Sequence, residues 1–245
     1  MAFLYVMPSE MWALDAPVTT ASGSTDADYV DDWLTDRRAS RPARATSGSV
    51  TWSITAASGE VGLIAMVNHN VTTTVTIGGG VSTTLTIPTL PPNGIPLNPF
   101  ATVTPAAITS LTVAVSGSAT AVTIGELIAG KYRTLSLAPF LGDTELEARD
   151  FRNEPGGSFG GVLPYDRGII ARTLTGTQVY PASERAVLQQ WFEGQRSGSK
   201  PSLIVPNSSV NDAWLCQMTA FSYRQVGPDA WRVTLSFEEY PRIRW

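Results

Sequence analysis

Hydrophobic and hydroxyl-bearing residues alternate through the middle of the chain. Between positions 50 and 55, Val50, Trp52 and Ile54 fall on one side of an extended backbone, and Thr or Ser falls on the other. A period of two with β-branched residues predicts half-buried strands. The same pattern predicts six strands in this part of the chain: 49–55, 61–68, 71–77, 83–88, 108–116 and 121–128.

Glycine and proline interrupt this pattern. Gly78 to Gly80 lie between two alternating runs and predict a hairpin tip. The proline-rich segment 88–105 predicts a long loop that packs against the sheet edge. Residues 142–168 have a loop-like composition, and residues 1–44 resemble an irregular leader with one short strand near 3–6 and a helical turn over 28–37.

The C-terminal third mixes both periodicities. Ser183 is placed to cap a helix over 184–196, and Gly198 to end it. Strands are predicted at 168–175 and 202–205, and a hairpin at 213–226 and 231–240. The apolar residues of the outgoing hairpin strand change phase, which predicts a β-bulge near Thr219 or Ala220. One helix on a sheet indicates an α+β arrangement.

These elements predict a mainly β protein, a jelly-roll β-sandwich followed by a second α+β domain. The expected division is a leader or docking segment at 1–44, the sandwich at 45–141, a linker loop at 142–168, and an α+β ring-forming domain at 169–245.

Charge is sparse and uneven. Glu60 is the one formal charge between positions 45 and 124, yet no run approaches the roughly 18 apolar residues of a membrane helix. The net charge of -4 argues against nucleic acid as a partner. Residues 1–36 carry only acids, and four arginines follow within 37–44. This segment is either a solvated acidic stretch with its compensating bases or a docking segment for neighbouring subunits.

Cysteine usage and the N-terminus indicate where the chain is made. Cys216 is the only cysteine, which excludes an internal disulfide, and it lies in an apolar strand pattern typical of the core. The first eight residues lack the basic start of a signal peptide. Both features favour synthesis in a reducing cytosol.

The inventory of reactive groups predicts no catalytic, cofactor-binding or metal-binding residues. His69 is the only histidine, which excludes a multi-histidine metal site, and its position between Asn68 and Asn70 favours a hydrogen-bonding turn residue over a catalyst. The glycine-rich run 156–161 lacks the Lys-Ser/Thr ending of a phosphate loop.

A glycoside hydrolase needs two carboxylates at a set separation. Three pairs are candidates, but all lie in polar sequence, with no sign of an apolar pocket that would raise one pKa. They are Asp31 with Asp32, Glu145 with Glu147, and Glu238 with Glu239.

Aromatic residues offer a further kind of site, because exposed rings stack on sugars. Most of the seven tryptophans occupy inward positions of predicted strands or of the helix and are expected in the core. Trp33 and Trp245 are the exceptions. The terminal segment 242–245, with two arginines and a tryptophan, suits burial against a neighbouring subunit.

Two segments together carry a family resemblance. Residues 61–71 form an apolar strand that ends in Asn68-His69-Asn70, and residues 122–132 contain Ile124-Gly125-Glu126-Leu127 followed by Gly130. This pair, in this order, resembles the jelly-roll module, similar to galactose-binding domains, of tail proteins from tailed bacteriophages and prophages. The physical features agree: a strand buried on both faces, a polar turn, and glycines where the backbone bends.

The resemblance implies a structural component of a phage tail tip or baseplate, located in the virion and made in the host cytoplasm. Its implied partners are other tail proteins (tube, hub, tape measure) in a homo-oligomeric ring, without a cofactor. The alternative is a carbohydrate-binding module that recognises a host surface glycan. A glycan hydrolase is the third hypothesis.

Overall fold

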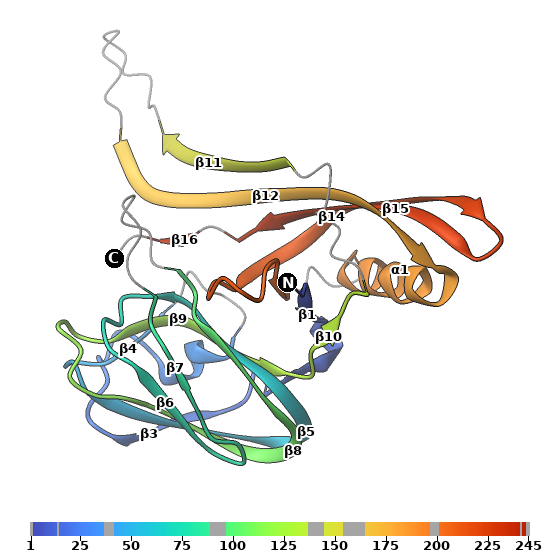
Figure 1. Cartoon of the computed structure of the whole chain (residues 1–245). Helices are drawn as coiled ribbons and strands as arrows, with labels where there is room; N and C mark the ends of the chain where they lie inside the picture. The colour runs from blue at the N-terminus through green and yellow to red at the C-terminus, as the bar shows by residue number, and fades with distance from the viewer. Residues whose placement is uncertain are drawn as a thin grey trace, which may run out of the picture.

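The computed structural model describes residues 2–13, 15–36, 42–88, 97–136, 145–153, 165–196, 201–240 and 242–243. Within them the chain forms two eight-stranded sheets, in which the strand pairs are antiparallel, and one α-helix (Figure 1). The predicted fold class, mainly β with a sandwich and a helix on a second sheet, is confirmed.

The first sheet, the sandwich sheet, has the strand order β2-β9-β5-β8-β6-β7, with β3 paired to β5 and β4 paired to β9. It is built around β5, which is twenty residues long and replaces the two separate strands predicted at 49–55 and 61–68. The first half of β5 pairs with β3, the second half pairs with β9, and β8 runs beside both halves. Its members are β2 (Met11–Trp12), β3 (Val18–Ser22), β4 (Ala43–Arg44), β5 (Val50–His69), β6 (Val75–Gly79), β7 (Thr83–Leu85), β8 (Phe100–Val115) and β9 (Thr123–Gly130).

Bulges allow the sandwich sheet to fold back on itself. The register between β5 and β8 shifts after Thr55 and again after Val61. Such bulges bend a strand and strengthen its twist. The two halves of β5 therefore line one apolar interior, the sandwich core, which includes Trp52 from the first half and Met66 from the second.

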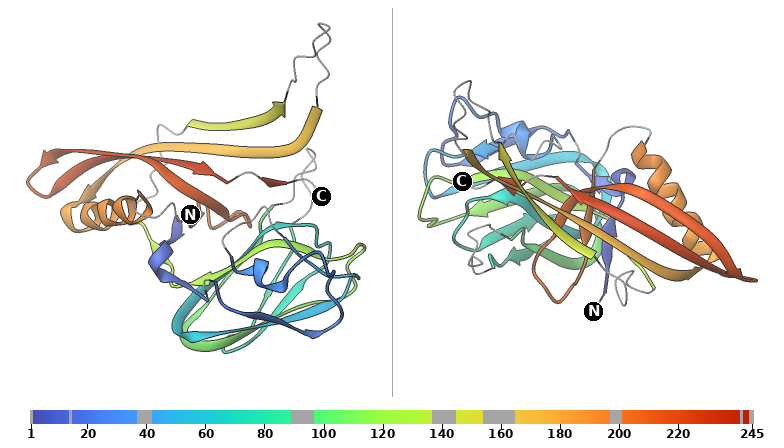
Figure 2. Two further views of the ribbon diagram at one scale, coloured as in Figure 1. Left: turned by 180° about the vertical axis from the view of Figure 1, so that it is seen from behind. Right: turned by 90° about the horizontal axis from the view of Figure 1, so that it is seen from above.

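The second sheet, the helix-backed sheet, has the order β10-β1-β13-β14-β15-β12-β11, with β16 paired to β12. The helix α1 (Ala182–Arg196) covers one face of it (Figure 2). Between helix and sheet, Trp191 stacks on Tyr5 with ring centroids 4.5 Å apart and lies against Phe237. The strands are β1 (Leu4–Val6), β10 (Arg133–Thr134), β11 (Glu145–Asn153), β12 (Tyr165–Pro181), β13 (Ser202–Val205), β14 (Trp214–Gly227), β15 (Ala230–Glu239) and β16 (Arg242–Ile243).

The two sheets meet through strands that are buried on both faces. In β1, Tyr5 contacts the core under α1, whereas Leu4 and Val6 face the sandwich. On the sandwich side, β5 presents its other face to the same contact through Leu63 and Val67. This joint, the inter-sheet core, also contains Ala65, Ile128, Leu203, Val205, Ala213 and Leu215. The strand before Asn-His-Asn is therefore apolar on both sides because a sheet covers each side.

The chain enters and leaves the sandwich at adjacent strands. Leu4 of β1 pairs with Thr134 of β10 on one side and with Val205 of β13 on the other. In the sequence, the whole sandwich sheet is thus inserted between β1 and β10, which are neighbouring strands of the helix-backed sheet. The N-terminal residues are not an irregular leader with a single strand, because β2, β3 and β4 join the sandwich sheet as well. The expected helical turn is the short 3-10 helix η2 (Asp31–Leu34), and a second one, η1 (Pro8–Glu10), follows β1.

Two loop predictions are wrong in part. Strand β8 begins at Phe100 and passes through Pro105, inside the segment 88–105 that was expected to be a loop. Thr102 pairs with Leu63 and Ala106 with Val61, so Pro105 lies where the ladder is interrupted and needs no amide donor. In the segment 142–168, residues 145–153 form β11 and pair with β12. Residues 89–96 and the glycine-rich run 156–161 lie outside the described residues.

Other local predictions are confirmed. β6 and β7 pair as a hairpin around the triple glycine, and the register of β14 with β15 shifts between Met218 and Ala220. The helix itself is confirmed, but the prediction that Ser183 caps it is wrong: the helix begins at Ala182, whose N–H is accepted by the Asp229 carboxylate in the β14–β15 turn at 3.1 Å. Cys216 is buried and unpaired. The four domain boundaries stay a prediction.

Truncating a side chain in the inter-sheet core tests this joint. Leu203 is fully buried there, so we expect Leu203→Ala to lower the free energy of unfolding by about 2–5 kcal/mol in urea titrations. The exposed control Val210→Ala is expected to change it by less than about 0.5 kcal/mol. A loss for Leu203→Ala no larger than that of the control would show that the two sheets are not joined there.

Candidate functional site

The Asn-His-Asn turn is a structural element with buried polar groups. Asn68 has a positive φ of 51°, and His69 is 1% exposed. The Nδ1 atom of His69 accepts the Val71 N–H at 3.2 Å, and its Nε2 atom lies 3.0 Å from the Leu97 carbonyl oxygen, to which it donates in the neutral tautomer. Both ring nitrogens are engaged, as expected for a turn residue that bonds its neighbours.

Asn70 connects this turn to the second segment of the resemblance. Its side-chain oxygen accepts the Thr123 N–H at 2.7 Å, and its side-chain nitrogen donates to the Ala121 carbonyl at 2.8 Å. Thr123 is the first residue of β9, which runs beside β5. The turn in the first segment therefore fixes the start of the strand in the second.

A chain of polar contacts continues from the turn into the helix-backed sheet. The Asn98 side-chain oxygen accepts the Asn68 N–H at 3.0 Å, and the Asn98 N–H donates to Asp212 at 3.0 Å. Arg172 donates to Asp212 at 2.8 Å and to both oxygens of Glu239 at 2.7 and 2.9 Å. Its guanidinium also lies 3.8 Å from the Trp214 ring centroid.

This buried charge cluster corrects one sequence-based expectation. The pair Glu238 and Glu239 was expected in polar surroundings, but Glu239 is 2% exposed. Burial raises the pKa of Glu239 above its ordinary value, and the Arg172 guanidinium acts in the opposite direction by stabilising the carboxylate. Glu238 is exposed, and although both residues border a cavity of about 220 Å³, Glu239 is occupied by its ion pair.

The other candidate acids also have structural contacts or are not described. Asp31 accepts the Trp52 indole N–H at 3.0 Å and the Thr20 hydroxyl at 2.6 Å, and Asp32 accepts the Val18 N–H at 2.7 Å. These bonds attach η2 to β3 and β5. The side chains of Glu145 and Glu147 lie outside the described residues. No cluster of three or more metal-ligating side chains occurs in the part of the chain that the structure describes.

The aromatic exceptions do not form a sugar platform. Trp33 is half-buried and meets Tyr29 edge-on, with centroids 6.0 Å apart. Trp245 lies outside the described residues. Among the helices of the described ranges, none is both long and apolar enough to cross a membrane.

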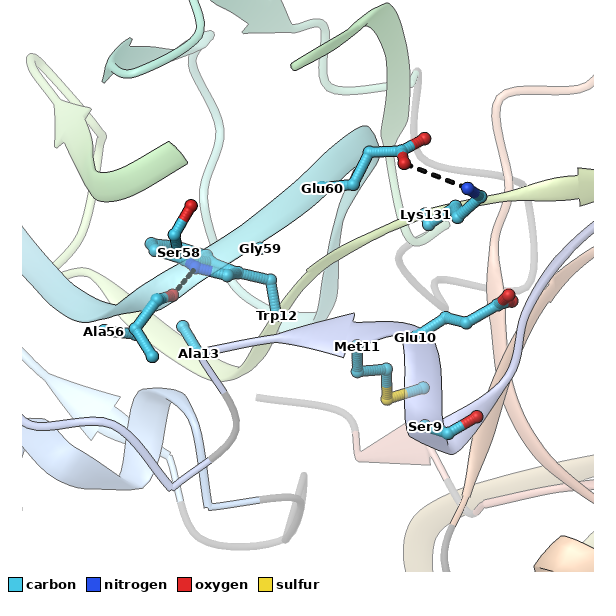
Figure 3. Close-up of a pocket in the computed structure, with 11 residues that line it drawn as sticks. Ser9, Glu10, Met11, Trp12, Ala13, Ala56, Ser58, Gly59, Glu60 and Lys131 are labelled. Carbon is cyan, nitrogen blue, oxygen red and sulfur yellow. Dashed lines mark hydrogen bonds and ion pairs between the residues drawn. The ribbon is translucent and has the colours of Figure 1, made fainter. Parts of the chain in front are cut away.

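A cavity that the sequence did not indicate opens at the rim of the sandwich. It has a volume of about 510 Å³ and lies between the segment 9–13, the bulged part of β5 at 56–60, and Lys131 (Figure 3). The Trp12 indole N–H donates to the Ala57 carbonyl at 2.9 Å, which fixes the ring against the bulge. A Cβ at Gly59 would lie 2.6 Å from the Trp12 ring, so glycine is required for this approach. We call this cavity the rim pocket.

Charged groups surround the rim pocket in pairs. Lys131 donates to Glu60 at 2.9 Å, and both side chains are nearly half exposed. Glu10 accepts two bonds from Arg133, at 2.6 and 2.9 Å, through one oxygen. The hydroxyls of Ser9 and Ser58 also line the wall. The pocket therefore offers fixed donors and acceptors, and each of its two carboxylates is already paired with a cation.

The only sequence signal for this pocket was the scarcity of the residue types that form its ion pair. Glu60 is the single charge between positions 45 and 124, and Lys131 is one of two lysines in the chain. Their meeting across 71 positions depends on the pairing of β5 with β9, which no local pattern specifies.

The chain is similar to known proteins in structure alone. No protein-family model and no curated protein matches the chain. Among solved structures, it is similar to chitosan-binding module 1 of a chitosanase/glucanase from Paenibacillus sp. IK-5, with 16% identity over 49% of this chain and 97% of that one and a TM-score of 0.38. It is also similar to the family 32 carbohydrate-binding module of C. perfringens NanJ, solved with galactose, with 16% identity, coverage of 54% and 99%, and a TM-score of 0.39.

A third match is to a larger protein. The chain covers 29% of SpGH29, with 52% of its own length, 12% identity and a TM-score of 0.41. At these identities and TM-scores, the matches do not identify a ligand or an activity for this chain.

Protonation of His69 is expected to destabilise the fold. Burial lowers the pKa of His69 from 6.5 to about 4, although its backbone bonds act in the opposite direction. The folded state therefore binds this proton less tightly than the unfolded state. Its contribution is present above pH 6.5 and is lost as the pH falls toward 4.

The loss amounts to up to about 3 kcal/mol of unfolding free energy at 1.36 kcal/mol per pKa unit. Urea titrations between pH 7 and pH 4 on the wild type and on His69→Gln measure it, because the variant lacks the imidazole but keeps the carboxyl groups, so the difference between the two pH profiles belongs to His69. Parallel pH profiles for the two proteins would contradict the assignment.

Proposed function

We propose that this chain is a carbohydrate-recognition protein that binds a short glycan in the rim pocket. The observation that carries the proposal is the wall of the pocket, where the Glu60–Lys131 ion pair and two serine hydroxyls surround an open cavity of about 510 Å³. Sugar hydroxyls donate to carboxylates and accept from ammonium groups, and such charge-assisted bonds are the stronger ones. The volume lies within the range of about 300–1,000 Å³ that is usual for small-ligand sites.

The fixed geometry of the wall supports recognition. Trp12 is bonded to the bulge and packs closely on Gly59, so the apolar floor is formed before a ligand arrives. A preformed site loses less conformational entropy on binding. Both pocket carboxylates are paired with cations, which favours binding over acid–base chemistry there.

A glycan array with the full chain, followed by calorimetry on the best glycan, tests this function. We expect Glu60→Gln to weaken binding about tenfold, since a bond to a charged group contributes about 1.5–3 kcal/mol. Asp26→Asn removes a carboxylate from another surface ion pair of the sandwich and is the matched control, expected to bind normally. A blank array, or equal affinities for the two variants, would refute binding in the rim pocket.

The second candidate is a structural component of a phage tail tip, assembling with other tail proteins into a ring. Two observations favour it. The Asn-His-Asn and Ile-Gly-Glu-Leu segments resemble tail modules, and the inter-sheet core joins the sandwich to a sheet with long, protruding strands. A building block needs such rigid attachment, and the two functions are compatible.

Purified particles of a phage or prophage that encodes this chain test the second candidate. Mass spectrometry is expected to find the chain in a fixed ratio to the tail proteins, and electron microscopy to place it at the tail tip. Its absence from particles that infect normally would exclude the structural role without bearing on glycan binding.

A further inference from the structure

The far end of the helix-backed sheet carries a basic face with no acidic partner in the part of the chain that the structure describes. On β15 and β14, Arg232 and Arg224 are directly opposite each other, and Val179 of β12 is opposite Arg232 on the other side. Their neighbours Val233 and Tyr180 point into the core under α1, so these three side chains lie on the face turned away from the helix. We call Val179, Arg224 and Arg232 the arginine face.

Two like charges on opposing residues of adjacent strands repel each other. Both arginines are exposed, and neither forms an ion pair with a carboxylate among the described residues. The nearby Asp229 is engaged by the amide at the start of α1. Further along the same face, paired residues of β12 and β15 carry hydroxyls that bond to each other, such as those of Thr177 and Thr234 at 2.8 Å. The arginine face is therefore an uncompensated positive charge with an exposed valine beside it.

The sandwich carries a surface of the opposite character. The acidic segment, residues 26–32, contains four aspartates, and within the described ranges the one cation paired with it is Arg44, 3.9 Å from Asp26. Asp28 is exposed, and its carboxylate has no bonded partner in the described ranges. Between the acids lies Val30, at 50% the most exposed large hydrophobic residue among those described. Among the described residues, each surface thus combines an exposed apolar residue with an exposed charge that has no ion-pair partner, Asp28 on one surface and the arginines on the other, and the signs are opposite.

One molecule cannot bring these two surfaces together. The acidic segment lies on the sandwich next to β3 and β4, whereas the arginine face lies near the free end of the β14–β15 hairpin, at the opposite end of the molecule (Figures 1 and 2). We propose that the arginine face binds the acidic segment of a second copy of this chain. Because the two surfaces differ, the contact is head-to-tail, and repetition gives a closed ring or an open filament.

The contact is predicted from charge and exposure alone and does not depend on sugar binding. It gives the ring of the second candidate function a specific interface. It is also independent of whether that ring belongs to a phage particle, because it is a property of the purified chain.

Charge reversal at both ends tests the proposal. We expect the wild type to self-associate at high micromolar concentration in sedimentation velocity runs, and to do so less as salt is raised. Arg224→Glu and Asp28→Arg alone should each weaken association at least about tenfold, since each places like charges in contact. In an equimolar mixture of the two variants every contact between unlike molecules is again between opposite charges, so association should return.

Glu193→Arg changes an exposed acid on α1, away from both surfaces, and is the matched control expected to associate like the wild type. Melting curves of all variants establish that each is folded. A wild type that stays monomeric at low salt would overturn the proposal. So would variants that associate normally, or a mixture that does not recover association.

Discussion

The arrangement of this protein depends on apolar contact between two sheets. The strands that make this contact are each buried on their other face as well. The short strand β1 contacts the core under α1 with one face and the sandwich with the other, and the second half of β5 contacts the sandwich core and β1 in the same way. Strands buried on both faces cannot shift register without moving side chains between two interiors. The relative position of the sandwich and the helix-backed sheet is therefore fixed by packing on each strand, with no dependence on a linker.

The charged groups at the edge of this joint are tolerated because they are bonded to one another. Arg172 contacts two carboxylates and the face of Trp214, and Asp212 extends the network to Asn98 and thus to the Asn-His-Asn turn. An isolated buried charge would cost several kcal/mol, whereas a bonded network adds directionality to an otherwise non-directional apolar contact. The same turn that starts β9 also aligns the two sheets, which gives its three polar residues a common physical role.

Much of the fold was predictable because its signals are local. Alternation identified Trp52 and Ile54 as inward, the triple glycine identified the β6–β7 hairpin, and a phase change identified the bulge near Thr219. Contacts between distant positions were not predictable in this way. Pro105 suggested a loop because the bulge that accommodates it is a property of the pairing with β5. Glu239 looked solvated because its burial depends on Arg172, 67 positions away. The rim pocket was missed for the same reason.

The insertion of the sandwich between β1 and β10 has a consequence for synthesis on the ribosome. The sandwich pairs with itself and can fold as soon as β9 has emerged, and β10 can then pair with one edge of β1. The other edge of β1 must wait for β13, whose Val205 pairs with Leu4. Contacts between residues so far apart in the sequence form slowly, and nascent chains fold from the N-terminus onward. One edge of β1, whose three residues are buried in the finished protein, therefore stays without its partner strand during most of translation, and this edge is where a chaperone would protect the chain.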